Sequence, residues 1–437
     1  MKTGMNLNAL PLLLFILCTW ASAAQPLPAT DPAAVGLSAQ RLQNISTVFG
    51  DHVRGGDIGG AVFMVARNGK LAYSDAVGFR DPVKLEAMTL DTIFRIYSMS
   101  KPIVSVAAMM LVEDGVMQLT DPVSKFIPAL KNVQVSIASV DEDSGETTYS
   151  LQALKRQMTV QDLLRHTAGL AYGEITANAQ VKDAYAKGGL YSTSTNFDIR
   201  SLTPQQQISA FARSPLVHQP GTVWEYSLAS DLLGRVVEVA CAQRLTDFLQ
   251  QRLFSPLHMS DSGFQVPSED LSRVAQPLPA DSKGNKSPQL IDLAVIPAND
   301  SGGAGGVSTA ADYLRFSQML LNGGELDGRR VMSRSSVELM TSDHLGTRIQ
   351  TPLTPGELLL GTPGYTFGLG FAVRQEQGIA GVPGSRGEFM WGGYAGTYFW
   401  IDPKERIVAV LMSQAPGPMR AYYRRLFKQL VYAAIID

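Results

Sequence analysis

The chain is constrained most by one stretch, residues 92–111, in which an apolar, β-branched run passes directly into a helical pattern. Residues 92–96 are typical of a buried strand. From Ile103 onward apolar residues recur at spacings of three and four, which predicts a helix. Pro102 lacks a backbone N–H and is tolerated in a helix only in the first turn, so the helix must begin close to Ser98.

This first turn contains a Ser-x-x-Lys tetrad, Ser98 to Lys101. Residues three apart share a helix face, so the Lys101 amine can reach the Ser98 hydroxyl. The helix N-terminus also favours negative charge that develops near Ser98. A hydroxyl beside a base is the arrangement of nucleophilic catalysis. The tetrad by itself leaves an alternative open, in which Ser98 is an N-cap and Lys101 a solvated first-turn residue.

Two later stretches supply further candidate site residues. Tyr226 is a candidate base, because a cation such as Lys101 would stabilise its phenolate form. Read by itself, Tyr226 fits an ordinary core residue better. Trp391, Gly392 and Gly393 lie on a predicted strand. Paired glycines in a strand let a ligand or another backbone approach closely, although a bulge or tight packing is the alternative.

The overall composition narrows the classes of function. With a net charge of −2 and no basic run, the 437-residue chain gives no support for nucleic-acid binding. The motif Gly-x-Ser-x-Gly is absent; in residues 383–387 Pro replaces its first glycine. The histidines show no metal-ligand spacing and none lies in a motif beside a candidate nucleophile, so we expect no metal, no cofactor and no Ser-His-Asp triad. They are His52, His166, His218, His258 and His344.

The N-terminus has the pattern of a secretory signal. Lys2 is followed by an apolar run, residues 10–20, and by small residues that fit a cleavage site, which predicts a signal peptide over residues 1–24. A retained membrane anchor is the alternative. Cleavage would leave Cys241 without a disulfide partner. We expect a periplasmic or secreted protein with no stable membrane anchor after cleavage.

Strand signals gather at the two ends of the chain and helical signals in the middle. We expect a helix from Ser38 to about Phe49, a hairpin turning at Asn68-Gly69, and a final helix over about 419–436. The late strands are predicted at 367–373, 389–393, 397–401 and 407–412, and an exposed hairpin at 133–151.

This distribution predicts an α/β (α+β) fold in which an antiparallel sheet is flanked by helices and interrupted by an inserted all-α domain. The α/β domain is expected to be discontinuous, formed by residues 25–105 and 300–437. Residues 106–299 would form the mostly helical domain, with loop insertions, and the site would lie between the two.

The three candidate elements, in this order, resemble the serine β-lactamase-like superfamily, which holds class C β-lactamases, DD-carboxypeptidases and family VIII carboxylesterases. The resemblance covers nearly all of the mature chain and includes residues 162–170, Asp-Leu-Leu-Arg-His-Thr-Ala-Gly-Leu. It implies that Ser98 and Lys101 form the first catalytic element and Tyr226 the second. It also implies an oxyanion hole made by the backbone N–H groups of Ser98 and Tyr394.

Two departures from the superfamily pattern bear on the substrate. Leu228 stands where β-lactamases have Asn, and Trp391-Gly392-Gly393 stands where they have Lys/His-Thr-Gly, the triplet that holds a substrate carboxylate. Both departures resemble the family VIII esterases, with the three residues of the altered triplet binding substrate and Trp391 forming an apolar wall.

The resemblance therefore implies a serine esterase acting on small-molecule, short-acyl esters, with weak β-lactam hydrolysis. The alternatives are a β-lactamase, a D-Ala-D-Ala carboxypeptidase or D-aminopeptidase, and an inactive cell-wall binding protein.

Overall fold

The computed structural model describes residues 27–194 and 197–437, so the predicted signal peptide over residues 1–24 lies outside the described residues. The core of the described chain is an eight-stranded sheet whose neighbouring strands all pair antiparallel. Its order is β10 (Tyr365–Phe367), β11 (Ala372–Arg374), β12 (Phe389–Gly392), β13 (Tyr398–Asp402), β14 (Ile407–Ser413), β1 (Gly60–Arg67), β2 (Lys70–Asp81) and β3 (Glu86–Ala87).

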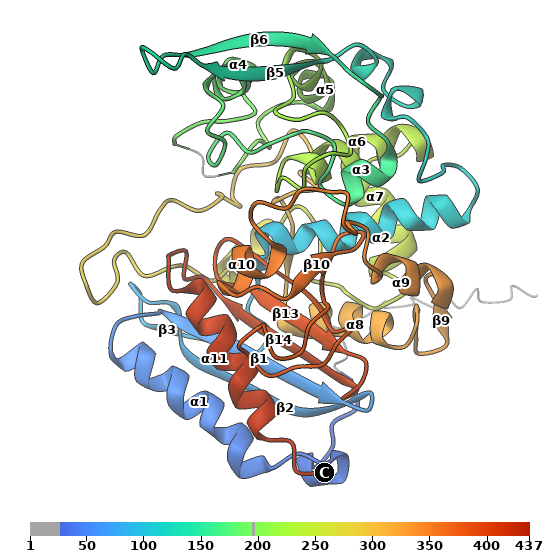
Figure 1. Cartoon of the computed structure of the whole chain (residues 1–437). Coiled ribbons are helices and arrows are strands. Elements are labelled where there is room, and N and C mark those ends of the chain that lie inside the picture. The colour runs from blue at the N-terminus through green and yellow to red at the C-terminus, as the bar shows by residue number, and fades with distance from the viewer. Residues whose placement is uncertain (1–26, 195–196) are drawn as a thin grey trace, which may run out of the picture.

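Helices cover both faces of this sheet (Figure 1), because successive side chains of a strand point to opposite faces. On β1, Phe63 packs against Phe49 of α1 (Ala39–Arg54) and Phe427 of α11 (Arg420–Ala433). Phe399 of β13 points to the other face, where it packs against Tyr313 of α8 (Ala310–Leu321). Every residue of β1 and β14 is buried as a result.

The rest of the chain is mostly helical and lies above the sheet in Figure 1. Helix α2 (Ser100–Glu113) is buried from Ser100 to Leu111 and packs against α6 (Ala229–Cys241). The other α-helices here are α3 (Val160–Leu164), α4 (Ala179–Gly188), α5 (Pro204–Arg213) and α7 (Leu245–Leu249), the last continuing into a π-helical turn at Gln250–Phe254. The expected exposed hairpin is present as β5 (Gln134–Val140) and β6 (Thr147–Ala153).

Short elements complete the structure. Helices α9 (Arg334–Met340) and α10 (Pro355–Leu360) lead from α8 to the sheet. The small strand pairs are β4 (Phe94–Arg95) with β7 (Val307–Ser308), and β8 (Glu325–Leu326) with β9 (Arg329–Arg330). The described chain also has 3₁₀ turns at Pro32–Val35, Tyr97–Met99, Val123–Lys125, Pro128–Leu130 and Ser268–Arg273.

The expected fold class, an antiparallel sheet flanked by helices with a helical insertion, is confirmed. One predicted strand is wrong: residues 367–373 form a hairpin between β10 and β11. Gly368 N–H donates to the Phe371 carbonyl, and Gly370 has a φ of +95°, which suits glycine and reverses the chain. The strand predicted at 92–96 is shorter, with only Phe94 and Arg95 paired.

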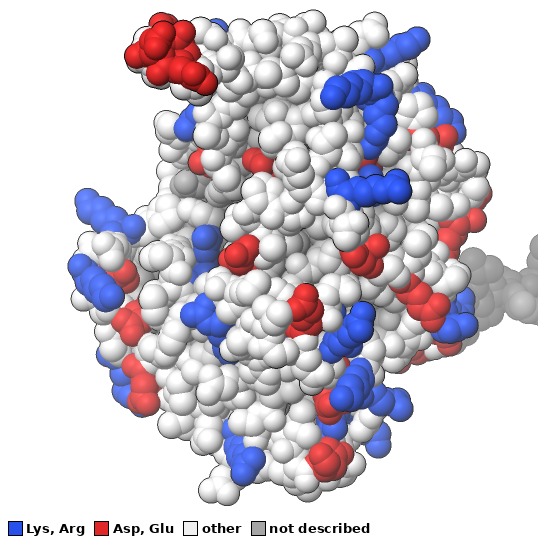
Figure 2. Space-filling model, in the orientation of Figure 1, with Lys and Arg blue, Asp and Glu red and all other residues white. Residues whose placement is uncertain are grey.

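The surface carries mixed charges, with one acidic group at the tip of the β5–β6 hairpin, formed by Asp141, Glu142, Asp143 and Glu146 (Figure 2). Within the described ranges, no helix is both long enough and apolar enough to cross a bilayer.

Candidate active site

Ser98 lies in the single 3₁₀ turn, Tyr97–Met99, that joins β4 to α2. Tyr97 has a φ of +44°, a conformation that costs a non-glycine residue about 1 kcal/mol or more and persists only where its surroundings enforce it. Here Tyr97 Oη accepts from Ile291 N–H at 2.9 Å, and Ser100 Oγ donates to the Tyr97 carbonyl at 2.6 Å. The turn therefore holds Ser98 in one orientation.

The structure brings together the three side chains that the sequence singled out. Tyr226 Oη donates to Ser98 Oγ at 2.5 Å, and Lys101 Nζ lies 3.2 Å from the same oxygen. Tyr226 lies just before α6, 128 residues further along the chain than Ser98. One hydroxyl thus has two partners that can exchange protons with it.

Lys101 is held by more than Ser98. Its Nζ donates to Tyr172 Oη at 2.9 Å and to the Gly303 carbonyl at 2.7 Å, so all three ammonium protons have acceptors. The amine also lies 4.7 Å from the centre of the Tyr226 ring. Burial is the main cause that raises the pKa of Tyr172 well above 10, and a negative charge on the Tyr226 oxygen would add to the rise, so Tyr172 stays neutral.

The glycine-rich loop 301–306, to which the sequence assigned no role, fixes the Gly303 carbonyl. Asp231 of α6 accepts from Ser301 Oγ at 2.6 Å and from Gly303 N–H at 3.1 Å. A side chain at 303 would meet the Asp231 carboxylate at 2.1 Å, so only glycine fits. Burial raises the pKa of Asp231, although the charge of Lys101 opposes this rise.

Two buried rings support Tyr226 from behind. The His166 ring lies 5.1 Å from the Tyr226 ring, and its Nδ1 is 3.2 Å from Ser227 Oγ. Burial, and then the charge of Lys101, lowers the pKa of His166 well below 6.5, so it is neutral at neutral pH. Trp391 is fully buried 5.5 Å from Tyr226. The prediction that Trp391 forms a wall for the substrate is corrected, because its ring lies behind Tyr226 and does not line the cavity.

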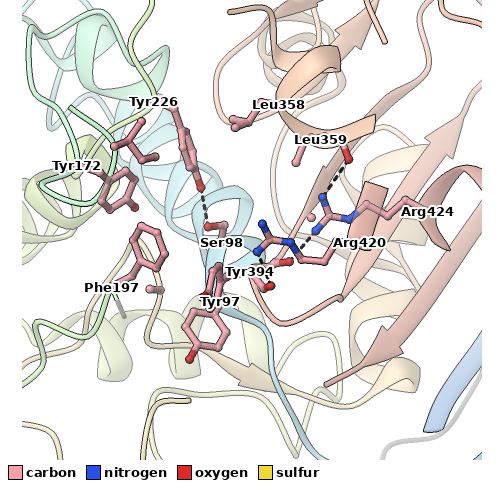
Figure 3. Close-up of a pocket in the computed structure, with 14 residues that line it drawn as sticks. Tyr97, Ser98, Tyr172, Phe197, Tyr226, Leu358, Leu359, Tyr394, Arg420 and Arg424 are labelled. Carbon is pink, nitrogen blue, oxygen red and sulfur yellow. Dashed lines mark hydrogen bonds between the residues drawn. The ribbon is translucent and has the colours of Figure 1, made fainter. Parts of the chain in front are cut away.

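Ser98 opens into a cavity of about 110 Å³. Figure 3 shows aromatic side chains on one side of Ser98 and two arginines of α11 on the other. The lining residues are Tyr97, Ser98, Tyr172, Ile175, Phe197, Tyr226, Ala304, Leu358, Leu359, Gly392, Gly393, Tyr394, Arg420 and Arg424. Gly392 and Gly393 border the cavity, and their role in binding substrate stays a prediction, whereas Leu228 is buried and does not line the cavity.

The end of β12 brings the Tyr394 backbone next to the Ser98 turn. A side chain at Gly393 would meet the Ile96 carbonyl at 2.4 Å, so this glycine permits the close approach. Arg424 Nη2 donates to the Gly393 carbonyl at 2.6 Å. That peptide is trans, so its N–H, which belongs to Tyr394, points away from Arg424. Among the described residues no hydrogen bond uses this N–H.

Several cavity residues were missed by sequence reasoning. Tyr172 lies two residues beyond the segment 162–170, and nothing in its local pattern marks it as a partner of Lys101. The last helix was predicted, but the sequence does not show that Arg420 and Arg424 point into the cavity. No cluster of His, Cys, Asp and Glu that could hold a metal ion occurs among the residues that the structure describes.

Several known proteins resemble this chain over most of its length. The family model described as Beta-lactamase matches residues 45–433. An uncharacterized protein of Mycobacterium tuberculosis (strain CDC 1551 / Oshkosh) is 34% identical over 82% of this chain and 86% of its own length. Esterase EstB of Burkholderia gladioli is 30% identical over 85% of this chain and 90% of its own.

A solved structure extends the likeness to three dimensions. It is described as EstCE1, a hydrolase with promiscuous acyltransferase activity, and superposes with a TM-score of 0.72 at 26% identity. The superposition covers 92% of this chain and 99% of that one. From the family match over nearly the whole described chain and the likeness to these relatives, we conclude that this chain belongs to the Beta-lactamase family of serine hydrolases.

Proposed function

We propose that this protein is a serine carboxylesterase that cleaves short-acyl esters through an acyl-serine intermediate. The observation that carries the proposal is the contact of one hydroxyl with two partners: Ser98 Oγ lies 2.5 Å from Tyr226 Oη and 3.2 Å from Lys101 Nζ, at the edge of the cavity. The similarity to an esterase and to a hydrolase with acyltransferase activity supports an ester as the substrate.

The geometry suggests an order of steps. In the reacting form Tyr226 is the phenolate that the Lys101 ammonium stabilises, and it accepts the Ser98 proton while Oγ bonds to the ester carbonyl carbon. The oxyanion of the tetrahedral intermediate accepts hydrogen bonds from the backbone N–H groups of Ser98 and Tyr394. The bond to the alcohol then breaks, and Tyr226 returns the proton to the leaving oxygen. Water attacks the acyl carbon and gives a proton to Tyr226. Tyr226 passes this proton to Ser98 Oγ as the bond between Oγ and the acyl carbon breaks, which releases the acid and restores Ser98 and the Tyr226 base.

The test compares purified protein with its Ser98→Ala variant on three substrates: a chromogenic short-chain ester, a cephalosporin and a D-Ala-D-Ala peptide. We expect ester turnover that falls by at least about 10³-fold in Ser98→Ala, because the nucleophile is lost. Ser139→Ala, an exposed serine of β5, is the matched control and should keep full activity. Turnover that survives Ser98→Ala would rule out Ser98 as the nucleophile.

The same assay decides the alternatives. We expect weak β-lactam hydrolysis at most, since Leu228 and Gly392 replace the polar groups of the superfamily pattern. A wide preference for the cephalosporin or the peptide would make the protein a β-lactamase or peptidase. A folded protein that turns over none of the three would favour the binding-protein alternative.

We further propose that the mature protein is periplasmic or secreted, and that it begins after residue 24. The charged start, the apolar run and the small residues before position 24 support this. N-terminal sequencing of the protein purified from each cell fraction tests it. An intact N-terminus in the membrane fraction would support the retained anchor instead.

A further inference from the structure

Two arginines of α11 face the nucleophile across the cavity. Arg420 and Arg424 both line the cavity. In Figure 3 the Arg420 guanidinium lies nearer to Ser98 than the Arg424 guanidinium does. Neither makes an ion pair with any Asp or Glu among the described residues. Both donate hydrogen bonds to backbone carbonyls: Arg420 to Tyr394 at 2.7 Å, and Arg424 to Leu359 and Gly393 at 3.1 and 2.6 Å.

Arg424 is 4% exposed, and its Nε is a buried donor that has no hydrogen-bond partner among the described residues. A buried charge without a counter-charge is costly, so such groups are normally paired. Burial, and then the charge of Arg420, lowers the pKa of Arg424 to about 9, which still leaves it charged at neutral pH. The cavity therefore holds positive charge that the described chain does not neutralise.

The remaining groups of the cavity do not offset this charge. Apart from Ser98 and the two arginines, the lining residues are aromatic, aliphatic or glycine, and include Tyr172, Phe197 and Leu358. Glu174, next to the lining residue Ile175, does not line the cavity, and its Oε1 accepts the Phe197 N–H at 3.1 Å.

The absence of a side chain at Gly392 leaves room for the Arg424 guanidinium. A side chain at 392 would meet the Arg424 guanidinium carbon at 2.8 Å, so a hydroxyl residue at this position would displace the guanidinium. The absence of a cation and a hydroxyl on β12 therefore does not leave the site without a cation. The positive charge comes from Arg420 and Arg424 of α11 instead of from β12.

We propose that the ester hydrolysed at this site carries a carboxylate, which pairs with Arg420 while the ester carbonyl lies at Ser98. Arg424 adds a second positive charge behind Arg420. Guanidinium groups suit this role because they pair with carboxylates in a planar, two-bond geometry. The inference rests on the proposed esterase function and narrows its substrate class.

The experiment compares esters that differ in one charge. On the acyl side, 4-nitrophenyl hydrogen succinate is compared with 4-nitrophenyl pentanoate. On the alcohol side, 4-acetoxybenzoate is compared with 4-acetoxybenzamide. The ratio of kcat/KM for the anionic to the neutral ester is measured in the full protein, in Arg420→Met and in Arg420→Lys. Arg425→Met is the matched control, because Arg425 lies on α11 but does not line the cavity.

We expect a ratio of at least about 10 in one of the two pairs, and that pair tells which side of the ester carries the carboxylate. Arg420→Met should bring the ratio close to 1, mainly through KM, while Arg420→Lys keeps part of it and Arg425→Met all of it. Because each ratio is taken within one variant, partial misfolding cancels.

Three results would overturn the inference. If both ratios are near 1 while Ser98→Ala still abolishes turnover, the protein is an esterase and the carboxylate proposal is wrong. A preference that persists in Arg420→Met would remove Arg420 from the proposed role. Hydrolysis of none of these esters would contradict the proposed function itself.

Discussion

Arg424 also orients the predicted oxyanion donor. It donates a hydrogen bond to the Gly393 carbonyl, which belongs to the same peptide as the Tyr394 N–H. We expect Arg424→Met to free that peptide and lower kcat about 10-fold to 100-fold, less than the ~10²–10³-fold loss of a direct oxyanion donor. KM for a neutral ester should change little, because that ester gains no charge pairing. Steady-state kinetics on 4-nitrophenyl pentanoate measure this, and a change confined to KM would contradict it.

Local chemistry in the sequence was enough to find Ser98, Lys101 and Tyr226, and the structure brings their polar atoms together. Ser98 and Lys101 share one helical turn, so their contact follows from helix geometry. The contact of Arg420 with the cavity does not, because it depends on how α11 packs across the sheet. The sequence contains both arginines but not the direction in which they point. The catalytic roles of the first three residues stay predictions until the variants are measured.

Among the elements, α3 shows how a short helix fixes the segment that leads to His166, whose ring packs against Tyr226. The Asp162 carboxylate, fully buried, closes a capping box with Thr159 and accepts from Arg156 and Arg165. We expect Asp162→Asn to lower the free energy of unfolding by about 3 kcal/mol, the low end for a broken buried pair, because Arg156 is partly exposed. Urea denaturation at pH 7 measures this, and a loss below about 1 kcal/mol would mean that the network contributes little.

The same carboxylate makes α3 sensitive to acid. Burial by itself would raise the pKa of Asp162, but hydrogen bonds from Arg156 and Thr159 outweigh it and hold the pKa below 3.8. Its contribution to stability is therefore complete above the unfolded pKa, near ~3.9, and is lost as the pH falls through the lower folded value. Urea midpoints from pH 6 to 3 should fall more steeply in the wild type than in Asp162→Asn. Parallel curves would contradict the assignment.

Elements with strong local signals were predicted well. Thr203, Pro204 and Gln206 are a capping-box pattern with proline at the first helical position, and in the structure they form the capping box that begins α5. The strand predicted at 367–373 failed because its composition is apolar throughout, while the turn depends on two glycines that the apolar run concealed. An apolar run predicts burial for a continuous strand and for a hairpin alike. The positive φ of Gly370 decides that the chain reverses here.

For the whole molecule, the site depends on segments that are far apart in the sequence. Lys101 of α2 meets Gly303 at 2.7 Å, and Gly393 packs against Ile96. The sequence predicted a boundary near 105 and 300, yet backbone bonds cross it: Trp224 N–H donates to the Gln350 carbonyl at 2.8 Å, and Ile93 N–H to the Arg273 carbonyl at 3.0 Å. Such contacts depend on tertiary packing, which no local pattern contains.

These crossing contacts lead us to expect that residues 106–299 and the sheet unfold together in urea, although chains of this size often unfold in stages. Three buried tryptophans report on the two parts: Trp224 in the helical part, and Trp391 and Trp400 in the sheet. In protein that begins at residue 25, Trp224→Phe leaves only the sheet signal, and the double change Trp391→Phe, Trp400→Phe leaves only the helical signal.

Each variant is followed by fluorescence and by ester turnover in the same urea series. Coincident midpoints of both signals within a variant are the expected result, because the nucleophile, its base and the predicted oxyanion donor come from both parts. Midpoints for turnover and for the Trp224 signal that lie well below the midpoint for the sheet signal would mean that the helical part opens independently. In that case the predicted two domains would be separate folding units, and the site would be lost when they part.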